Sequence, residues 1–214
     1  MTMKKLILCA AFFAAVSSVD AQTYKETFDS NSLEWTECAY KNGVGTAIID
    51  KGVMTIASKG ERIGMALWTG NAADKKAATF FETHCYAPID VLKPFEIHSI
   101  VNVKKFTDDN LAGIAFNYKD NGNFYCFAFN ENFVKFGRYV DGEYVGEIMQ
   151  GVKWKKSKKA DMKWSLYSDG QTLTFKVDGT AIMTVRYMPL AYNGFGFYTF
   201  GAQELSVDEV EFRQ

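Results

Sequence analysis

Acidic residues close enough for acid–base catalysis occur near the C-terminus, in the sequence D-E-V-E that contains Asp208, Glu209 and Glu211. Glycosidases need two carboxyl groups about 5–5.5 Å apart in retaining enzymes and about 6.5–9.5 Å apart in inverting ones. Residues two apart on a strand face are separated by roughly 6.5–7 Å, so Glu209 and Glu211 could share a face. The surrounding pattern is that of an outer strand with its charges in water. The sequence therefore assigns no catalytic residue.

Calcium binding is a second chemistry that acidic residues could support. Glu26, Asp29 and Asp208 lie near the two ends of the chain, and their oxygens suit Ca²⁺ if these ends pair as neighbouring strands. The alternative is ordinary turn chemistry, since D-S-N-S from Asp29 is typical of loops. No cofactor is required by any motif, and a structural calcium ion remains an open expectation.

Nucleophilic catalysis has little support in the sequence. The chain contains two histidines, His84 and His98, and no G-x-S-x-G motif. His98 lies in F-E-I-H-S-I-V-N-V, where it shares a predicted strand face with Ile100 and Asn102. This pattern is typical of a partly exposed strand histidine.

A binding surface is better supported, by residues 112–129, A-G-I-A-F-N-Y-K-D-N-G-N-F-Y-C-F-A-F. The D-N-G-N tetrapeptide predicts a tight hairpin, because Asn and Gly tolerate positive φ. Before it, large and small residues alternate, so one strand face is bulky and the other is small and partly polar. The bulky set is Ile114, Phe116 and Tyr118, and the small set is Gly113, Ala115 and Asn117.

A sheet face without bulk can admit a ligand, and planar rings, amides and guanidinium groups suit the apolar faces and hydroxyls of a sugar. The predicted ligand-binding residues are His98, Asn102, Asn117, Tyr125, Arg138 and Tyr198. The alternative is that Tyr125, which shares a face with Phe127 and Phe129, belongs to a core between two sheets.

The predicted ligand-binding residues are expected to lie on short β-strands. Fourteen strands are predicted between Tyr24 and Arg213, separated by turn signals such as D-G and bounded by Gly, Asn and Asp. No segment keeps a helical apolar period over three turns. The sequence predicts an all-β fold, an antiparallel two-sheet β-sandwich in a single domain over residues 22–214.

The N-terminus has the pattern of a signal peptide over residues 1–21. Two lysines precede an apolar run of eleven residues, Leu6 to Val16, which is too short to span a bilayer, and V-D-A ends at Ala21. We expect a secreted, periplasmic or cell-surface protein that begins at Gln22. The alternative is a retained anchor, and no later segment could span a membrane.

The composition of the chain excludes some classes of binding partner. Without residues 1–21, 193 of the 214 residues remain, with 22 basic and 24 acidic side chains. The chain therefore has no excess of basic side chains that would attract nucleic acid or an anionic membrane. Three cysteines remain, of which Cys38 and Cys85 are the pair expected to form any disulfide, whereas Cys126 is expected to be a buried thiol. The oligomeric state is left open.

Five segments of the sequence have a recurring pattern of strands and turns: residues 28–35, 48–56, 112–127, 164–179 and 194–212. Together they resemble the concanavalin A-like lectin/glucanase superfamily of jelly rolls, especially secreted Bacteroidetes domains of the laminin-G-like and keto-disaccharide-hydrolase-like groups. The resemblance implies two antiparallel sheets with a concave face that holds carbohydrate. Bacterial β-glucanases of the superfamily carry an E-x-D-x-E strand, which this chain lacks, so their catalytic residues are not carried over.

We therefore expect a secreted, lectin-like carbohydrate-binding domain. One alternative is a glycoside hydrolase or lyase of another pattern, with carboxylates near turns at Asp108, Asp109, Asp120 or Glu131. Another is a structural or interaction protein of the cell envelope, which an extended exposed apolar patch would favour.

Overall fold

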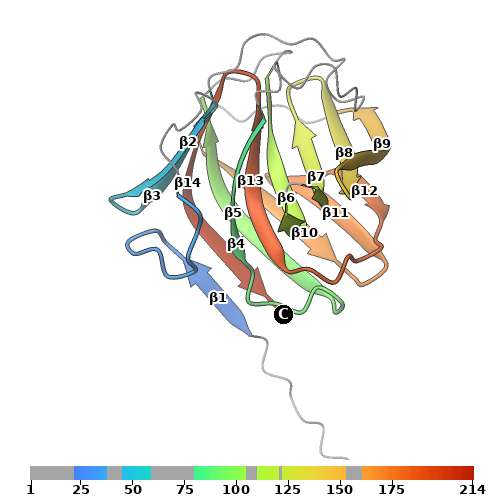
Figure 1. The fold of residues 1–214 in the computed structure, drawn as a ribbon, viewed down its shortest axis with the longest axis horizontal. Helices are drawn as coiled ribbons and strands as arrows, with labels where there is room; N and C mark the ends of the chain where they lie inside the picture. Colours follow the sequence, from blue (N-terminus) through green and yellow to red (C-terminus); the bar gives the residue numbers. More distant parts are fainter. Residues whose placement is uncertain (1–21, 38–44, 59–79, 105–109, 121, 153–160) are drawn as a thin grey trace, which may run out of the picture.

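In the part of the chain that the structure describes, fourteen strands form two antiparallel sheets that stack face to face (Figure 1). The computed structural model describes residues 22–37, 45–58, 80–104, 110–120, 122–152 and 161–214. The prediction of an all-β antiparallel two-sheet sandwich is confirmed. The segment 1–21, Cys38, Asp108 and Asp109 lie outside the described residues.

One sheet, here called the terminal sheet, contains both ends of the described chain. Its order is β12 (Thr180–Arg186), β11 (Thr172–Val177), β10 (Asp161–Ser168), β5 (Phe95–Val103), β14 (Gln203–Arg213), β3 (Val53–Ser58) and β2 (Gly45–Asp50), with β1 (Thr23–Glu26) also paired to β14. The N-terminal strand therefore lies beside the C-terminal strand, as Glu26 opposite Val210 shows.

The other sheet, here called the central sheet, is built largely from the middle of the chain. Its order is β4 (Phe80–Tyr86), β13 (Gly194–Phe200), β6 (Leu111–Asp120), β7 (Asn123–Phe129), β8 (Phe133–Val140) and β9 (Glu143–Gly151). In Figure 1, β2 and β3 lie at one side of the sandwich, and β8, β9 and β12 lie at the other.

The core lies between the sheets because alternation gives each strand one apolar face. In β11, Leu173, Phe175 and Val177 are buried, while the intervening residues are partly exposed. Rings from both sheets interlock: Phe127 of the central sheet stacks on Phe175 of the terminal sheet with 5.4 Å between ring centroids. Burial of such rings is worth several kcal/mol each, on the order of 2–3 per side chain.

Tight turns lie where Gly follows Asp or Lys. Both central residues have positive φ at Lys51-Gly52, Asp141-Gly142 and Asp178-Gly179, the geometry of a two-residue hairpin turn. The D-N-G-N hairpin is also confirmed, because β6 ends at Asp120 and β7 begins at its partner Asn123. The carboxylate of Asp120 accepts hydrogen bonds from Gly122 N and Asn123 Nδ2, which lower its pKa.

A bulge in β6 overturns part of the predicted alternation. Asn117 has φ 47°, and the pairing with β7 jumps from Phe116 to Asp120. The extra residue reverses the faces, so Tyr118 packs on the outer side of the sheet with Ala115 rather than in the core with Ile114. The prediction that Tyr118 shares a face with Phe116 is wrong for this reason.

The two cysteines in the described part of the chain, Cys85 and Cys126, are both buried. Burial raises the pKa of the Cys85 thiol. Since Cys38 is outside the described residues, a Cys38–Cys85 disulfide stays a prediction. No described helix is long and apolar enough to cross a membrane.

Candidate functional site

The outer face of the central sheet has a floor of small residues. Gly196, Ala115, Cys126 and Gly137 lie opposite one another in register on four adjacent strands, β13, β6, β7 and β8. With neighbouring strands about 4.8 Å apart, this small-residue row extends over roughly 14 Å. The small face predicted from Gly113, Ala115 and Asn117 is therefore present only in part, because Asn117 is not on it and Ala115 and Cys126 are buried in an apolar cluster with Tyr118 and Phe124.

An aromatic row runs beside the floor and crosses the same strands. It consists of Tyr86, His84, Tyr118, Phe124 and Tyr139. The ring centroids of His84 and Tyr118 are 4.2 Å apart, and those of Phe124 and Tyr139 are 4.6 Å apart and stacked. Tyr86 is 65% exposed, whereas Tyr118 and Phe124 are buried. The accessible end of the row is thus at Tyr86.

Glycine on β13 allows the row to continue across that strand. Gly194 lies between Tyr86 of β4 and Tyr118 of β6, and Gly196 lies opposite His84. Neither glycine carries a side chain that would separate the His84 ring from the Tyr118 ring. A Cβ on Gly194 would also lie 2.3 Å from the Tyr118 carbonyl oxygen, so the approach of β13 to β6 requires glycine.

Protonation of His84 is expected to make the stability of the folded protein depend on pH. Burial lowers the pKa of the imidazole below 6.5, so folding disfavours the protonated ring. The folded state then binds fewer protons than the unfolded state, and stability is expected to fall as pH decreases below about 6.5. Thermal melts between pH 7.5 and 5 should show a larger loss of melting temperature for the wild type than for His84→Gln. Equal losses would contradict this role of His84.

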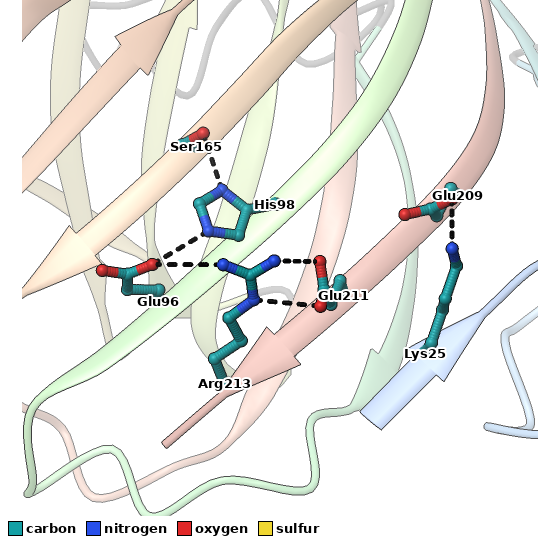
Figure 2. A network of polar contacts seen from close by, with 7 residues as sticks. All are labelled: Lys25, Glu96, His98, Ser165, Glu209, Glu211 and Arg213. Atoms are coloured by element: carbon teal, nitrogen blue, oxygen red, sulfur yellow. Dashed lines mark hydrogen bonds and ion pairs between the residues drawn. The ribbon is translucent and has the colours of Figure 1, made fainter. Parts of the chain in front are cut away.

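The structure does not bring the predicted ligand-binding residues into one groove. His98 and Asn102 lie on the outer face of the terminal sheet, on the opposite side of the molecule from the aromatic row. Figure 2 shows His98 between Glu96 and Ser165, with its Nε2 3.0 Å from Glu96 Oε2 and its Nδ1 2.9 Å from Ser165 Oγ. Asn102 donates to Asp161 Oδ1 at 3.1 Å.

The other predicted ligand-binding residues belong to the central sheet, and three of them, Tyr125, Arg138 and Asn117, do not lie on its outer face. Tyr125 is in the inter-sheet core, the alternative recognised from the sequence, and Arg138 lies opposite it on β8. Asn117 is buried, donating to Tyr192 O and accepting from the Tyr187 hydroxyl. Tyr198 is on β13, and its side chain is outside what the structure describes. A sugar-binding role for these residues stays a prediction.

The three predicted calcium ligands are not gathered around one point. Both oxygens of the Glu26 carboxylate accept hydrogen bonds within its own turn, and Asp29 Oδ2 accepts one from Thr27. Asp208 is exposed at a bulge of β14, and its pKa is raised by partial burial and by nearby Asp161. Among the described residues, no group of three or more His, Cys, Asp or Glu side chains could hold a metal ion.

Two of the three D-E-V-E carboxylates, Glu209 and Glu211, are in ion pairs on the terminal sheet. Figure 2 shows Lys25 Nζ 2.7 Å from Glu209 and Arg213 Nη2 2.7 Å from Glu211. The hydrogen bond from Arg213 lowers the pKa of Glu211. The Lys25–Glu209 pair connects β1 to β14, and the Arg213–Glu211 pair lies along β14 itself, so both carboxylates have a structural use.

Sequence reasoning missed the aromatic row itself. The H-C-Y triplet at residues 84–86 placed His84 and Tyr86 on one strand face, and this was the available signal. Their meeting with Tyr118 depends on β13, which comes more than a hundred residues later in the chain.

No protein-family model matches the chain, and no curated protein is similar to it in sequence. Solved structures are similar at low identity. The carbohydrate-binding module CBM66 from Bacillus subtilis has 15% identity and a TM-score of 0.51, with 82% of this chain and 94% of that one covered.

Two glucanases are similar over a comparable length. The Bacillus licheniformis β-glucanase has 11% identity and a TM-score of 0.57, with 89% and 97% of the two chains covered. The catalytic domain of a Thermotoga petrophila endo-1,3-β-glucanase (laminarinase) has 9% identity and a TM-score of 0.56, with 91% and 98% covered. At this identity the likeness concerns the fold. The chain therefore shares the two-sheet jelly-roll sandwich fold of these structures.

Proposed function

We propose that the protein binds carbohydrate at the exposed end of the aromatic row on the outer face of the central sheet. The observation that carries the proposal is the row itself, in which the exposed Tyr86 and its neighbour His84 on β4 meet Tyr118 of β6 across β13. A carbohydrate-binding module and glucanases share the fold, which supports the same ligand class.

The chemistry of the row suits a sugar. An exposed ring can stack on the apolar C–H face of a pyranose, while the Tyr86 hydroxyl and the His84 nitrogens can exchange hydrogen bonds with sugar hydroxyls. The contacts of His84 with Tyr118 and of Tyr86 with His84 hold these rings in place, which reduces the entropy lost on binding.

Tyr86→Ala is expected to weaken glycan binding about tenfold, the effect of losing ~1.4 kcal/mol of stacking, with no change in melting temperature. The measurement is affinity electrophoresis or a glycan array with plant, microbial and host polysaccharides. Tyr167→Ala is the matched control, because Tyr167 is an exposed tyrosine on the terminal sheet. Uniformly absent binding by the wild type, or equal binding by Tyr86→Ala, would overturn the proposal.

The same polysaccharides distinguish binding from turnover. Release of reducing ends or unsaturated products by the wild type would make the protein a glycoside hydrolase or lyase, and the bound sugar would then be its substrate.

We further propose that the protein is exported, on the pattern of residues 1–21. A mature N-terminus at Gln22, determined by mass spectrometry of protein from the native host, tests this step.

A further inference from the structure

A cavity of about 240 Å³ opens at the edge of the sandwich where β8 and β9 of the central sheet face β12 of the terminal sheet. Its lining includes Tyr125, Phe136, Arg138, Ile148, Arg186 and Met188. The cavity faces the space between the sheets, whereas the aromatic row lies on the outer face of the central sheet. The two places are therefore independent.

The inner wall of the cavity is the end of a ring stack. Phe116 stacks on Tyr125 with 5.2 Å between centroids, and Tyr125 stacks on Phe136 with 5.5 Å between centroids. The Tyr125 hydroxyl donates to the Met188 carbonyl oxygen, which fixes the ring. Ile148 and Met188 at the mouth are about half exposed, which leaves apolar surface open to an incoming group.

Two guanidinium groups accompany this apolar wall. Arg138 lies directly opposite Tyr125 in the β7–β8 pair, so its side chain leaves the sheet on the inner face, and it is only partly exposed. Arg186 ends β12 on the other side of the mouth. Within the described residues, no carboxylate pairs with either one, in contrast to Arg213 with Glu211. A partly buried guanidinium without an anion favours binding one.

We propose that this cavity binds a small aromatic carboxylate, with its ring stacked at Tyr125 and Phe136 and its carboxylate paired with Arg138 and Arg186. A flat ring continues the existing stack, and guanidinium groups match the planar geometry of a carboxylate. The volume accommodates one ring-sized group. A neutral sugar would leave its hydroxyls against the apolar wall, so it fits this cavity less well than the outer face.

The test is titration of the full mature chain with benzoate, followed by calorimetry or ligand-observed NMR. Benzoate is expected to bind with a Kd of about 1 mM, which is typical of a ligand of this size. Benzyl alcohol, which keeps the ring, and hexanoate, which keeps the carboxylate, should each bind about tenfold more weakly. Equal binding of benzoate and benzyl alcohol would overturn the ion pair, and equal binding of benzoate and hexanoate would overturn the ring site.

Substitutions of the two arginines test whether benzoate binds in this cavity. Arg138→Gln and Arg186→Gln should each weaken benzoate binding about tenfold, while Lys163→Gln, a cation on the outer face of the terminal sheet, leaves it unchanged. Arg186 is exposed, so its variant reports on the site even where Arg138→Gln affects folding. Tyr86→Ala should leave benzoate binding intact, which separates this result from the glycan experiment. Unchanged binding in both arginine variants would overturn the proposal.

Discussion

Gly113→Ala is expected to lower the free energy of unfolding by about 4 kcal/mol or more, or to prevent folding altogether. Gly113 lies in β6 opposite Ala128 of β7, in the middle of the central sheet. A Cβ on Gly113 would lie 1.8 Å from the Phe127 carbonyl oxygen and 2.7 Å from the Ala128 Cα. Both are backbone atoms, so no side-chain rotation relieves the overlap.

The strands around Gly113 leave no direction in which to move. β7 is held on its far side by β8, and β6 is held by β13. Alanine would therefore break the β6–β7 pairing, and with it the burial of Phe127 and Ile114 in the core. For a domain of this size, ~4 kcal/mol corresponds to a loss of roughly 8–16 °C in melting temperature.

Gly151→Ala on β9 is the matched control for this experiment. Its Cβ would meet no atom closer than the Asn132 carbonyl oxygen at 3.8 Å, so its stability should change by less than about 1 kcal/mol. Urea unfolding can be followed by the fluorescence of Trp35 and Trp164, which are both buried. Wild-type stability in Gly113→Ala would show that β6 and β7 do not approach as closely as described.

Gly113 also shows what a glycine in a strand pattern can mean. From the sequence, Gly113 and Ala115 indicated a face with room for a ligand. In the structure the small-residue row exists, yet Gly113 is required for the approach of two backbones. An isolated glycine in a strand is compatible with both readings, and only the position of the neighbouring backbone decides between them.

Most of the strands and hairpins could be predicted from the sequence, because alternation and turn signals depend only on residues that are close together in the chain. Alternation placed the strands, and the D-G and N-G pairs placed the hairpins, including β6–β7 and β8–β9. The bulge at Asn117 was not predictable in this way. Its positive φ occurs at a non-glycine residue, and the fold supports it through hydrogen bonds to Tyr187 and Tyr192, which are about seventy residues away.

The candidate site depended on strand order, which alternation does not supply. Tyr125 and Arg138 were predicted together and do lie opposite each other, because a single hairpin joins β7 to β8. His98 and Asn117 were predicted together as well, yet β5 and β6 belong to different sheets. Consecutive strands therefore allowed a correct grouping only where a tight turn paired them.

Glu26→Ala is expected to lower the free energy of unfolding by about 3 kcal/mol, whether or not calcium is present. Glu26 is 2% exposed, and its carboxylate accepts hydrogen bonds from Phe28 N at 2.9 Å, Leu33 N at 3.0 Å and Ser32 Oγ at 2.7 Å. Alanine would leave these donors without an acceptor inside the protein. The turn they form positions Phe28 for its edge contact with Trp35 in the core, at 5.7 Å between centroids.

The experiment separates this structural role from the calcium site predicted from the sequence. Melting temperatures are measured in calcium and in EDTA for the wild type, Glu26→Ala, Glu26→Gln and Asp208→Ala. If Glu26 anchors the turn, Glu26→Ala loses roughly 6–12 °C equally in both buffers, and Glu26→Gln recovers part of the loss because its amide oxygen still accepts. Asp208→Ala should change little, since Asp208 is exposed. A calcium-dependent rise in wild-type stability that all three variants lose would instead mean that these carboxylates bind the ion together, and the hydrogen bonds of Glu26 would then be secondary to it.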